Sequence, residues 1–230
     1  MNKNMITEEE KRRIKEERRI QKDINYFLGR KFINIDIGFR CPLQCPRCQR
    51  QRQHLNHGEK VPGYDLTMSE IEKLSNFYTT FGFCGQLSDP IFHPKFPQIL
   101  KLLYDKEVHC QVHNAASQKS LDWYIKCFKA NPRADWIFGI DGMPEESHKY
   151  RINQNGVKLF NVMLKSKEYL KRPPTWQYIA FSYNENNVET AKKLAKKSGV
   201  KFLLVESSRW INSEDPLKPK NDEVSLNARR

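Results

Sequence analysis

Residues 32–48 read FINIDIGFRCPLQCPRC and place a short run of alternating apolar and polar residues directly before three cysteines. The alternation predicts a half-buried β-strand, and the loop after it carries Cys41, Cys45 and Cys48 at the spacing C-x3-C-x2-C. In a chain with reduced thiols, clustered cysteines more often bind metal than form disulfides. Because three thiols are one ligand short of a closed four-cysteine site, the spacing predicts a metal centre with an open position.

Two kinds of centre fit this loop. A cubane iron–sulfur cluster that is bound by only three cysteines leaves one iron open to another ligand. A structural zinc site would instead take a fourth ligand from the protein, and His54 or His57 follows closely enough in the sequence to supply it. The zinc alternative describes a non-enzymatic module that binds nucleic acid through the surrounding arginines.

Length and composition describe the class of protein. The chain has 230 residues, which is enough for one domain with a substantial core. No stretch approaches the roughly 18 apolar residues of a membrane helix, and the charged N-terminus has no apolar segment of a secretory signal. We therefore expect a cytoplasmic protein without membrane contact. The other cysteines, Cys84, Cys110 and Cys127, are interpreted as small buried hydrophobic residues.

The order of the predicted elements indicates the fold class. Strands are predicted at 32–37, 81–86, 108–114, 135–141, 176–183 and 200–206, and helices at 67–79, 95–104, 119–129, 156–171 and 187–198. Thr67 with Glu70 predicts a helix start, and Gly199 predicts a helix stop. Six strands that alternate with helices predict a parallel sheet with right-handed crossovers. Periodicity alone does not separate an open doubly wound sheet from a partial barrel.

The chain divides into three predicted segments. Residues 1–30 form an N-terminal extension with a charged helix over 7–29, residues 31–212 form the core domain, and residues 213–230 form a polar, proline-spaced tail that is expected to be flexible.

A C-x3-C-x2-C motif directly after a first strand resembles the signature of the radical S-adenosylmethionine (radical SAM) superfamily. The resemblance covers about residues 30–212. It is strongest to the core domain of the group with SPASM or twitch extensions, through Gly139-Ile-Asp-Gly and the later Tyr150-Arg151. It implies an α/β fold, a partial (β/α)6 TIM-type barrel, in which Cys41, Cys45 and Cys48 hold a 4Fe–4S cluster.

The same resemblance implies an enzymatic activity. In this family S-adenosylmethionine chelates the fourth iron, and its reductive cleavage gives a 5′-deoxyadenosyl radical that abstracts hydrogen from a substrate. The cofactor supplies the difficult chemistry and the protein positions it. The implied partner is a reductant such as flavodoxin or ferredoxin.

Polar residues at the ends of the predicted strands are expected around the cofactor, because ligands of such folds bind at the carboxyl ends of the strands. Ser88-Asp89-Pro90 is similar to the Gly-Glu-Pro element that grips the methionine ammonium, and Asn114 matches an asparagine after the third strand. Arg151 suits the methionine carboxylate, since a guanidinium can pair with it bidentately. A salt bridge to Asp141 is the alternative use of that side chain.

Four more residues complete the expected cofactor contacts. They follow the later strands and are Asp141, Ser182, Asn184 and Arg209. Ser182 and Asn184 are expected near the ribose, and Arg209 near a carboxylate of the cofactor or of an anionic substrate. No catalytic acid or base is assigned.

The chain departs from the family pattern at three places. Arg47 stands where relatives carry an aromatic residue, Gly139 stands where they often carry a serine near the ribose, and no cysteine follows Cys127. Auxiliary clusters of SPASM and twitch proteins need such later cysteines, so a single cluster is expected.

The substrate stays open at this stage. The resemblance suggests a peptide or protein, whereas a net charge of +13 favours a polyanion such as a nucleic acid. A degenerate radical SAM fold that binds the cluster as a partner subunit, without catalysis, is a further alternative.

Overall fold

The computed structural model describes residues 9, 13, 16, 17, 31–52, 61, 63–84 and 86–221. The four described residues before 31 are helical. The rest of the predicted N-terminal helix lies outside the described residues, as do His54, His57 and the end of the predicted tail.

Six parallel strands form one sheet in the order of the sequence. They are β1 (Phe32–Asn34), β2 (Thr80–Phe83), β3 (His109–Asn114), β4 (Asp135–Gly139), β5 (Thr175–Ile179) and β6 (Lys201–Val205). Within this sheet β1 pairs only with β2, and β6 pairs only with β5, so the barrel is open between its two edge strands. The predicted α/β fold with a partial barrel is confirmed.

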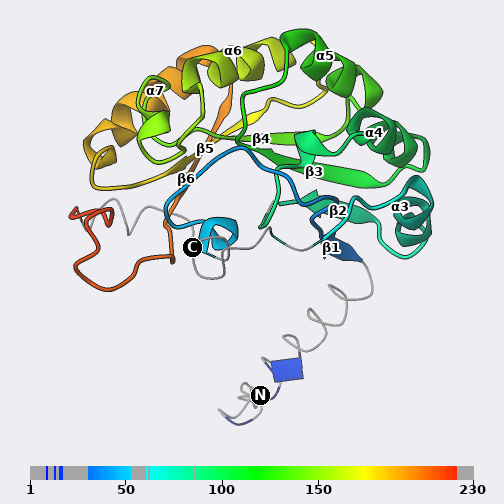
Figure 1. Cartoon of the computed structure of the whole chain (residues 1–230), viewed down its shortest axis with the longest axis horizontal. Helices are drawn as coiled ribbons and strands as arrows, with labels where there is room; N and C mark the ends of the chain where they lie inside the picture. Colours follow the sequence, from blue (N-terminus) through cyan, green and yellow to red (C-terminus); the bar gives the residue numbers. More distant parts are fainter. Residues whose placement is uncertain are drawn as a thin grey trace, which may run out of the picture.

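A helix follows each of the first five strands and packs on the outer side of the curved sheet (Figure 1). These helices are α3 (Met68–Ser75), α4 (Phe96–Asp105), α5 (Leu121–Ala130), α6 (Gly156–Ser166) and α7 (Val188–Ser198). The predicted capping box of Thr67 and Glu70 starts α3. Gly199 ends α7 at a φ of 66°, a left-handed conformation that favours glycine. None of the described helices has the length and apolarity needed to cross a bilayer.

Alternation along the strands separates a hydrophobic core from an inner cavity. Successive side chains of a strand point to opposite faces. In β4 and β5 the large residues Trp136, Phe138, Trp176 and Tyr178 are buried, at 1% exposure or less. The residues that alternate with them point to the inner face, and four of these line the cavity described below: Ile137, Gly139, Gln177 and Ile179. The sheet therefore has one aromatic side and one side that is available for ligands.

Five of the six strands end earlier than predicted on their carboxyl side, whereas β3 ends at Asn114 as predicted. Beyond the ends of β4 and β5, one more N–H still donates to the next strand, from Ile140 to Gln177 and from Ala180 to Val205, and the chain then continues into loops. The N–H of Asp141, for example, donates to Ser147 Oγ at 2.8 Å. From the loop after β4, Tyr150 and Arg151 line the cavity described below.

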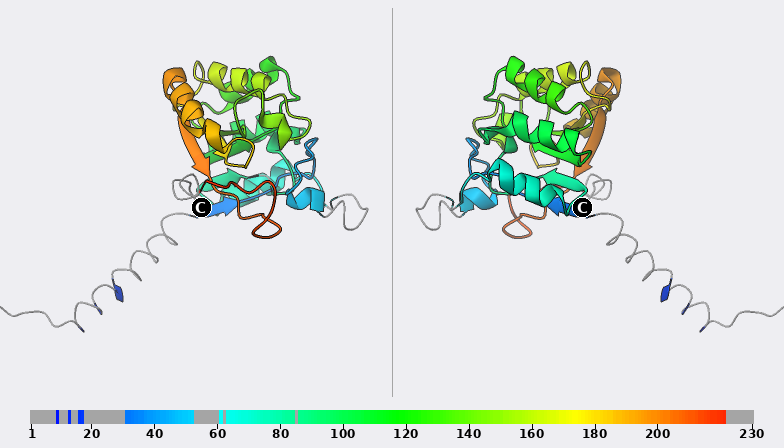
Figure 2. Two further views of the ribbon diagram at one scale, coloured as in Figure 1. Left: turned by 90° about the vertical axis from the view of Figure 1, so that its left-hand side faces the viewer. Right: turned by 90° about the vertical axis from the view of Figure 1, so that its right-hand side faces the viewer.

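The segment after residue 212 is held more closely than predicted. Asp215 is buried, and Ser182 Oγ donates to the carbonyl of Pro216 at 2.6 Å. Lys220 N and Asn221 N both donate to Glu185 Oε2. Figure 2 shows this red segment beside the blue one that contains the motif cysteines. We call residues 210–221 the C-terminal strap.

Candidate functional site

A cavity of about 310 Å³ lies at the carboxyl ends of the strands. The three motif cysteines form part of its wall, and residues from the ends of β2 to β6 form the remainder. Of the expected cofactor contacts, five line it: Ser88, Asp89, Asn114, Arg151 and Arg209. The fold therefore brings the thiols and most of the expected polar residues to one place.

An ion pair and hydrogen bonds to backbone carbonyls hold the loop that carries the three cysteines, residues 40–50, which we call the thiol loop. Arg47 binds Asp215 of the strap through two hydrogen bonds, from Nε at 3.0 Å and from Nη2 at 3.2 Å. Arg50 donates to the carbonyls of Phe39 and Leu87. Arg47, which stands in place of a family aromatic residue, thus ties the loop to a segment 168 residues away.

The three thiols are of the ligand type that iron–sulfur clusters take, and all three line one cavity. Burial raises the pKa of Cys41 to about 12 and that of Cys45 to about 11, so both are neutral before a metal replaces their protons. Within the described part of the chain, no three His, Cys, Asp or Glu side chains gather closely enough to hold one metal ion. The irons of a cubane occupy separate corners, and its sulfur ligands are therefore spaced farther apart than those of a single ion.

Asp36, which the sequence interpretation passed over, shapes the loop after β2. Its carboxylate accepts the N–H groups of Gln86, Leu87 and Ser88, and the hydroxyl of Ser88 at 2.7 Å. Ser88 is therefore held against the end of β1, and its hydroxyl is already engaged. An aspartate inside an alternating strand pattern looks like a solvent-facing residue, so the sequence gives little signal for this role.

Asp89 fastens the loop after β2 to the end of β3. Its buried carboxylate accepts the N–H groups of Ala115 and Ala116 at 2.8 Å and the side-chain amide of Asn114 at 3.2 Å. The oxygen of that amide accepts from the Tyr124 hydroxyl at 3.0 Å. Burial raises the pKa of Asp89, and these donors oppose the rise. Both side chains shape the wall of the cavity, and most of their polar groups are used within the protein.

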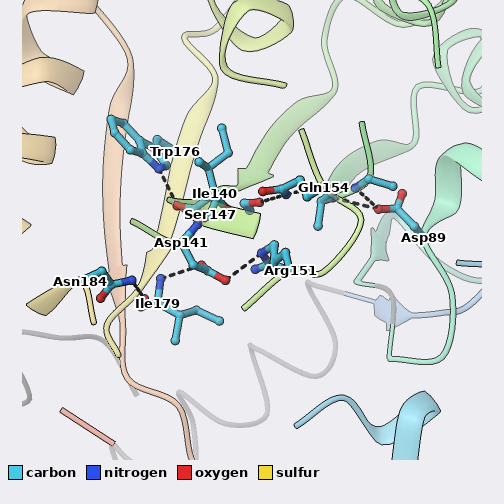
Figure 3. Close-up of polar contacts among 12 residues, drawn as sticks. Asp89, Ile140, Asp141, Ser147, Arg151, Gln154, Trp176, Ile179 and Asn184 are labelled. Carbon is cyan, nitrogen blue, oxygen red and sulfur yellow. Dashed lines mark hydrogen bonds and ion pairs between the residues drawn. The ribbon is translucent and has the colours of Figure 1, made fainter. Parts of the chain in front are cut away.

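Asp141 and Arg151 form a buried ion pair behind the cavity wall (Figure 3). Arg151 Nε lies 2.7 Å from Asp141 Oδ2, and the N–H of Ile179 donates to Asp141 Oδ1 at 2.9 Å. Burial raises the pKa of Asp141, and the Arg151 charge opposes that rise. Asp141 does not line the cavity, whereas Arg151 does. The salt bridge is thus present, and Arg151 also forms part of the cavity wall.

Gly139 provides room for this guanidinium. A Cβ atom at residue 139 would lie 2.7 Å from Arg151 Nη2 and 3.0 Å from Arg151 Cζ. The serine of the family pattern would therefore collide with Arg151 here. Beside it, Gln154 Nε2 donates to the carbonyls of Ala115 and Gly139 and joins the ends of β3 and β4 (Figure 3).

Ser182 and Asn184 are not brought to the cavity. Ser182 binds the strap through its hydroxyl and its N–H. Asn184 is fully buried, accepts the N–H of Phe181 at 2.7 Å and donates to the carbonyl of Ile179 at 3.1 Å. Both residues organise the loop after β5.

Arg209 and Cys84 occupy the side of the cavity near β6 and β2. Arg209 Nη2 donates to Gln86 Oε1 at 2.9 Å. Cys84 lines the cavity, unlike Cys110 and Cys127, which are at most 1% exposed. The interpretation of Cys84 as a core residue is therefore wrong, while that of Cys110 and Cys127 is confirmed.

Comparisons with known proteins support the fold. By sequence, no protein-family model and no curated protein matches the chain. By structure, it is similar to Streptococcus suis SuiB bound to precursor peptide SuiA, with a TM-score of 0.66 at 8% identity over 86% of this chain and 45% of SuiB. It is also similar to anSMEcpe with bound AdoMet and the Cp18Cys peptide, with a TM-score of 0.58 at 15% identity over 84% and 55%.

A third similar structure is a radical SAM methyltransferase from Sphaerobacter thermophilus, with a TM-score of 0.52 at 12% identity over 84% of this chain and 60% of that one. The chain thus spans about half the length of these proteins. Structural similarity at such low sequence identity establishes the architecture alone. The chemistry has to be argued from the residues of the site. The chain shares the fold of these three proteins, one of which is a radical SAM methyltransferase.

Proposed function

We propose that this protein is a radical SAM enzyme. The single observation that carries the proposal is that Cys41, Cys45 and Cys48 line one cavity with Arg151 and the loop after β2, in the fold of that superfamily. When bound, a 4Fe–4S cluster with S-adenosylmethionine supplies a 5′-deoxyadenosyl radical for hydrogen abstraction.

The residues of the chain would hold and orient the cofactor. The three thiols are the cluster ligands, and Arg151 offers its terminal nitrogens to the methionine carboxylate. Asp141 fixes the guanidinium from behind through Nε, so its orientation is set before the ligand arrives. The loop Ser88–Asp89 is held rigidly from β1 and β3, and this supports contact to the methionine ammonium through its backbone carbonyls.

The substrate we favour is a peptide or protein, with an electron from a low-potential carrier such as flavodoxin or ferredoxin. Two similar structures were solved with peptides. The arginines of the thiol loop, which suggested nucleic acid, are largely engaged within the protein. Arg40 donates to Asp65 at 2.6 Å, Arg47 binds Asp215, and Arg50 binds two carbonyls. They do not offer the series of free cations that a nucleic acid backbone needs.

The test is anaerobic reconstitution of the full chain with iron and sulfide, followed by dithionite and S-adenosylmethionine. We expect a brown protein that forms 5′-deoxyadenosine, and a variant with Cys41, Cys45 and Cys48 changed to alanine that forms none. A cluster-loaded protein without product would indicate the non-catalytic partner subunit. A colourless protein that loads zinc, and loses it on His54→Ala or His57→Ala, would establish the zinc module.

A further inference from the structure

We propose that Arg209, with Gln86 beside it, forms an anion subsite for the substrate, and that the ligand it fits is a peptide with a side-chain carboxylate. The inference rests on the proposed function. Arg151 is taken there as a cofactor contact, and the inference assigns the substrate to Arg209 on the side of the cavity near β6.

The subsite is built across the open side of the barrel. Arg209 follows β6 and Gln86 follows β2, yet Arg209 Nη2 donates to Gln86 Oε1 at 2.9 Å. Both residues line the cavity, and the N–H of Arg209 donates to Ser207 Oγ at 3.2 Å. Arg151 lies against Gly139 of β4, whereas Arg209 reaches the loop after β2. The two guanidinium groups thus have different immediate neighbours, and we assign them to different ligands.

Among the described contacts, Arg209 is not paired with a carboxylate, unlike the arginines of three ion pairs around the site. Arg50 on the cavity wall also donates to neutral acceptors, but it is occupied by two backbone carbonyls. Arg40, Arg47 and Arg151 each pair with an aspartate, namely Asp65, Asp215 and Asp141. Arg209 donates to a neutral amide, which uses one of the five N–H groups of a guanidinium and leaves the positive charge in place. A carboxylate can take two of the remaining donors side by side.

A peptide carboxylate fits this wall better than a phosphate backbone does. Nucleic acids bind through several cations in series, whereas the neighbouring arginines have partners within the protein. One acidic side chain of a peptide needs only one such guanidinium.

Cys84 gives the subsite a direct reporter. It lines the same cavity as Gln86 and Arg209 and is half-buried. Burial and the nearby Asp36 raise the pKa of its thiol, and Gln86 and Arg209 oppose that rise. Trypsin releases it in residues 74–95, which contain no other cysteine. The rate of Cys84 alkylation can thus be followed by mass spectrometry, and it needs neither catalysis nor a bound cluster.

The experiment measures alkylation of Cys84 by iodoacetamide in the full chain, with and without a reconstituted cluster. The probes are two acetylated tripeptide amides, Ala-Glu-Ala and Ala-Gln-Ala, and inorganic phosphate. We expect the glutamate peptide to slow the alkylation and the glutamine peptide to leave it unchanged. Equal effects of the two peptides, or stronger protection by phosphate, would overturn the proposal.

Two variants test the same point from opposite sides. Arg209→Ala should weaken protection by the glutamate peptide about tenfold or more, the cost of one charge-assisted pair. Gln86→Glu keeps the shape of the side chain but puts a carboxylate against Arg209. It should therefore weaken protection by the glutamate peptide at least as much as Arg209→Ala does. Lys193→Ala, which removes an exposed charge on α7, is the matched control and should change nothing.

The outcomes separate the two proposals. Wild-type protein that forms 5′-deoxyadenosine but shows no peptide protection would overturn the subsite alone. Protein that shows the protection but never forms the product would overturn the proposed function. Protection that survives Arg209→Ala would place the peptide elsewhere and contradict the subsite.

Discussion

The two walls of the cavity hold their arginines in opposite ways. On the wall of β3 and β4, Arg151 is 12% exposed and is fixed by Asp141, which has no exposed side-chain surface. On the wall near β6, Arg209 is exposed and donates to a neutral amide. A group that is fixed in advance suits a ligand that never changes, such as a cofactor. An exposed charged group that is not locked in an ion pair suits ligands that vary, such as peptide side chains.

The largest effect should come from Asp141→Ala. It removes the partner of a buried guanidinium and the acceptor of the Ile179 N–H. We expect the free energy of unfolding to fall by about 3–5 kcal/mol, as measured by urea denaturation of the full chain. S-adenosylmethionine binding should be lost as well.

The control for this change is Asp65→Ala, which breaks the Arg40 ion pair. The side chains of Arg40 and Asp65 are 37% and 27% exposed. We therefore expect the free energy of unfolding to fall by only about 1 kcal/mol. Equal losses in the two variants would show that the wall of β3 and β4 is no more fixed than the surface.

Asp215→Ala should have the next largest effect, because it frees the strap. Asp215 binds Arg47 and accepts the N–H groups of Ile211 and Leu217. We expect the free energy of unfolding to fall by about 2–3 kcal/mol. This is less than for a wholly buried pair, because the Arg47 side chain is 20% exposed. Tryptic cleavage after Arg209 and Lys220 should become faster. Unchanged cleavage would show that the strap is held by its other contacts.

The same ion pair predicts a pH dependence. The hydrogen bond from Arg47 lowers the pKa of Asp215 from 3.8 to about 2. A lowered pKa stabilises the fold at pH values above the ordinary one, and that contribution is lost as the pH falls through the folded value. The stability difference between wild type and Asp215→Asn should therefore be constant above about pH 5 and shrink between about pH 4 and pH 2. A difference that already shrinks near neutral pH would contradict this.

Gly139→Ala should have the smallest effect on stability and a specific effect on binding. The new Cβ would lie 2.7 Å from Arg151 Nη2, and we expect a loss of about 1–2 kcal/mol with weaker S-adenosylmethionine binding by calorimetry. Gly199→Ala is the control, because Gly199 does not line the cavity. Its φ of 66° favours glycine, so the alanine should lower the free energy of unfolding by about 1 kcal/mol. If both variants weaken binding equally, Arg151 is not displaced.

Much of the fold could be predicted from the sequence because its signals are local. Strand and helix periodicity, the Thr67 cap and the Gly199 stop each act within a few residues. The sequence also predicts the thiol loop after β1. It gives the salt bridge of Arg151 with Asp141 as the alternative to a contact with the methionine carboxylate.

The site was harder to predict, because a polar residue after a strand can face a ligand or close its own loop. Asn184 does the second, since its side chain accepts the N–H of Phe181. Asp36 is hidden in an alternating strand pattern. Asp215 stands in a proline-spaced polar stretch, and its partner Arg47 is 168 residues away, so no local pattern indicates the ion pair.

The ion pair of Arg47 with Asp215 also orders events during synthesis. Chains emerge from the ribosome N-terminus first and domains fold as they emerge, but contacts this distant in sequence close a long loop and form late. The thiol loop therefore reaches its final shape only after Asp215, 168 residues later in the chain, has been synthesised. Any metal that is delivered earlier meets a loop whose conformation is not yet fixed.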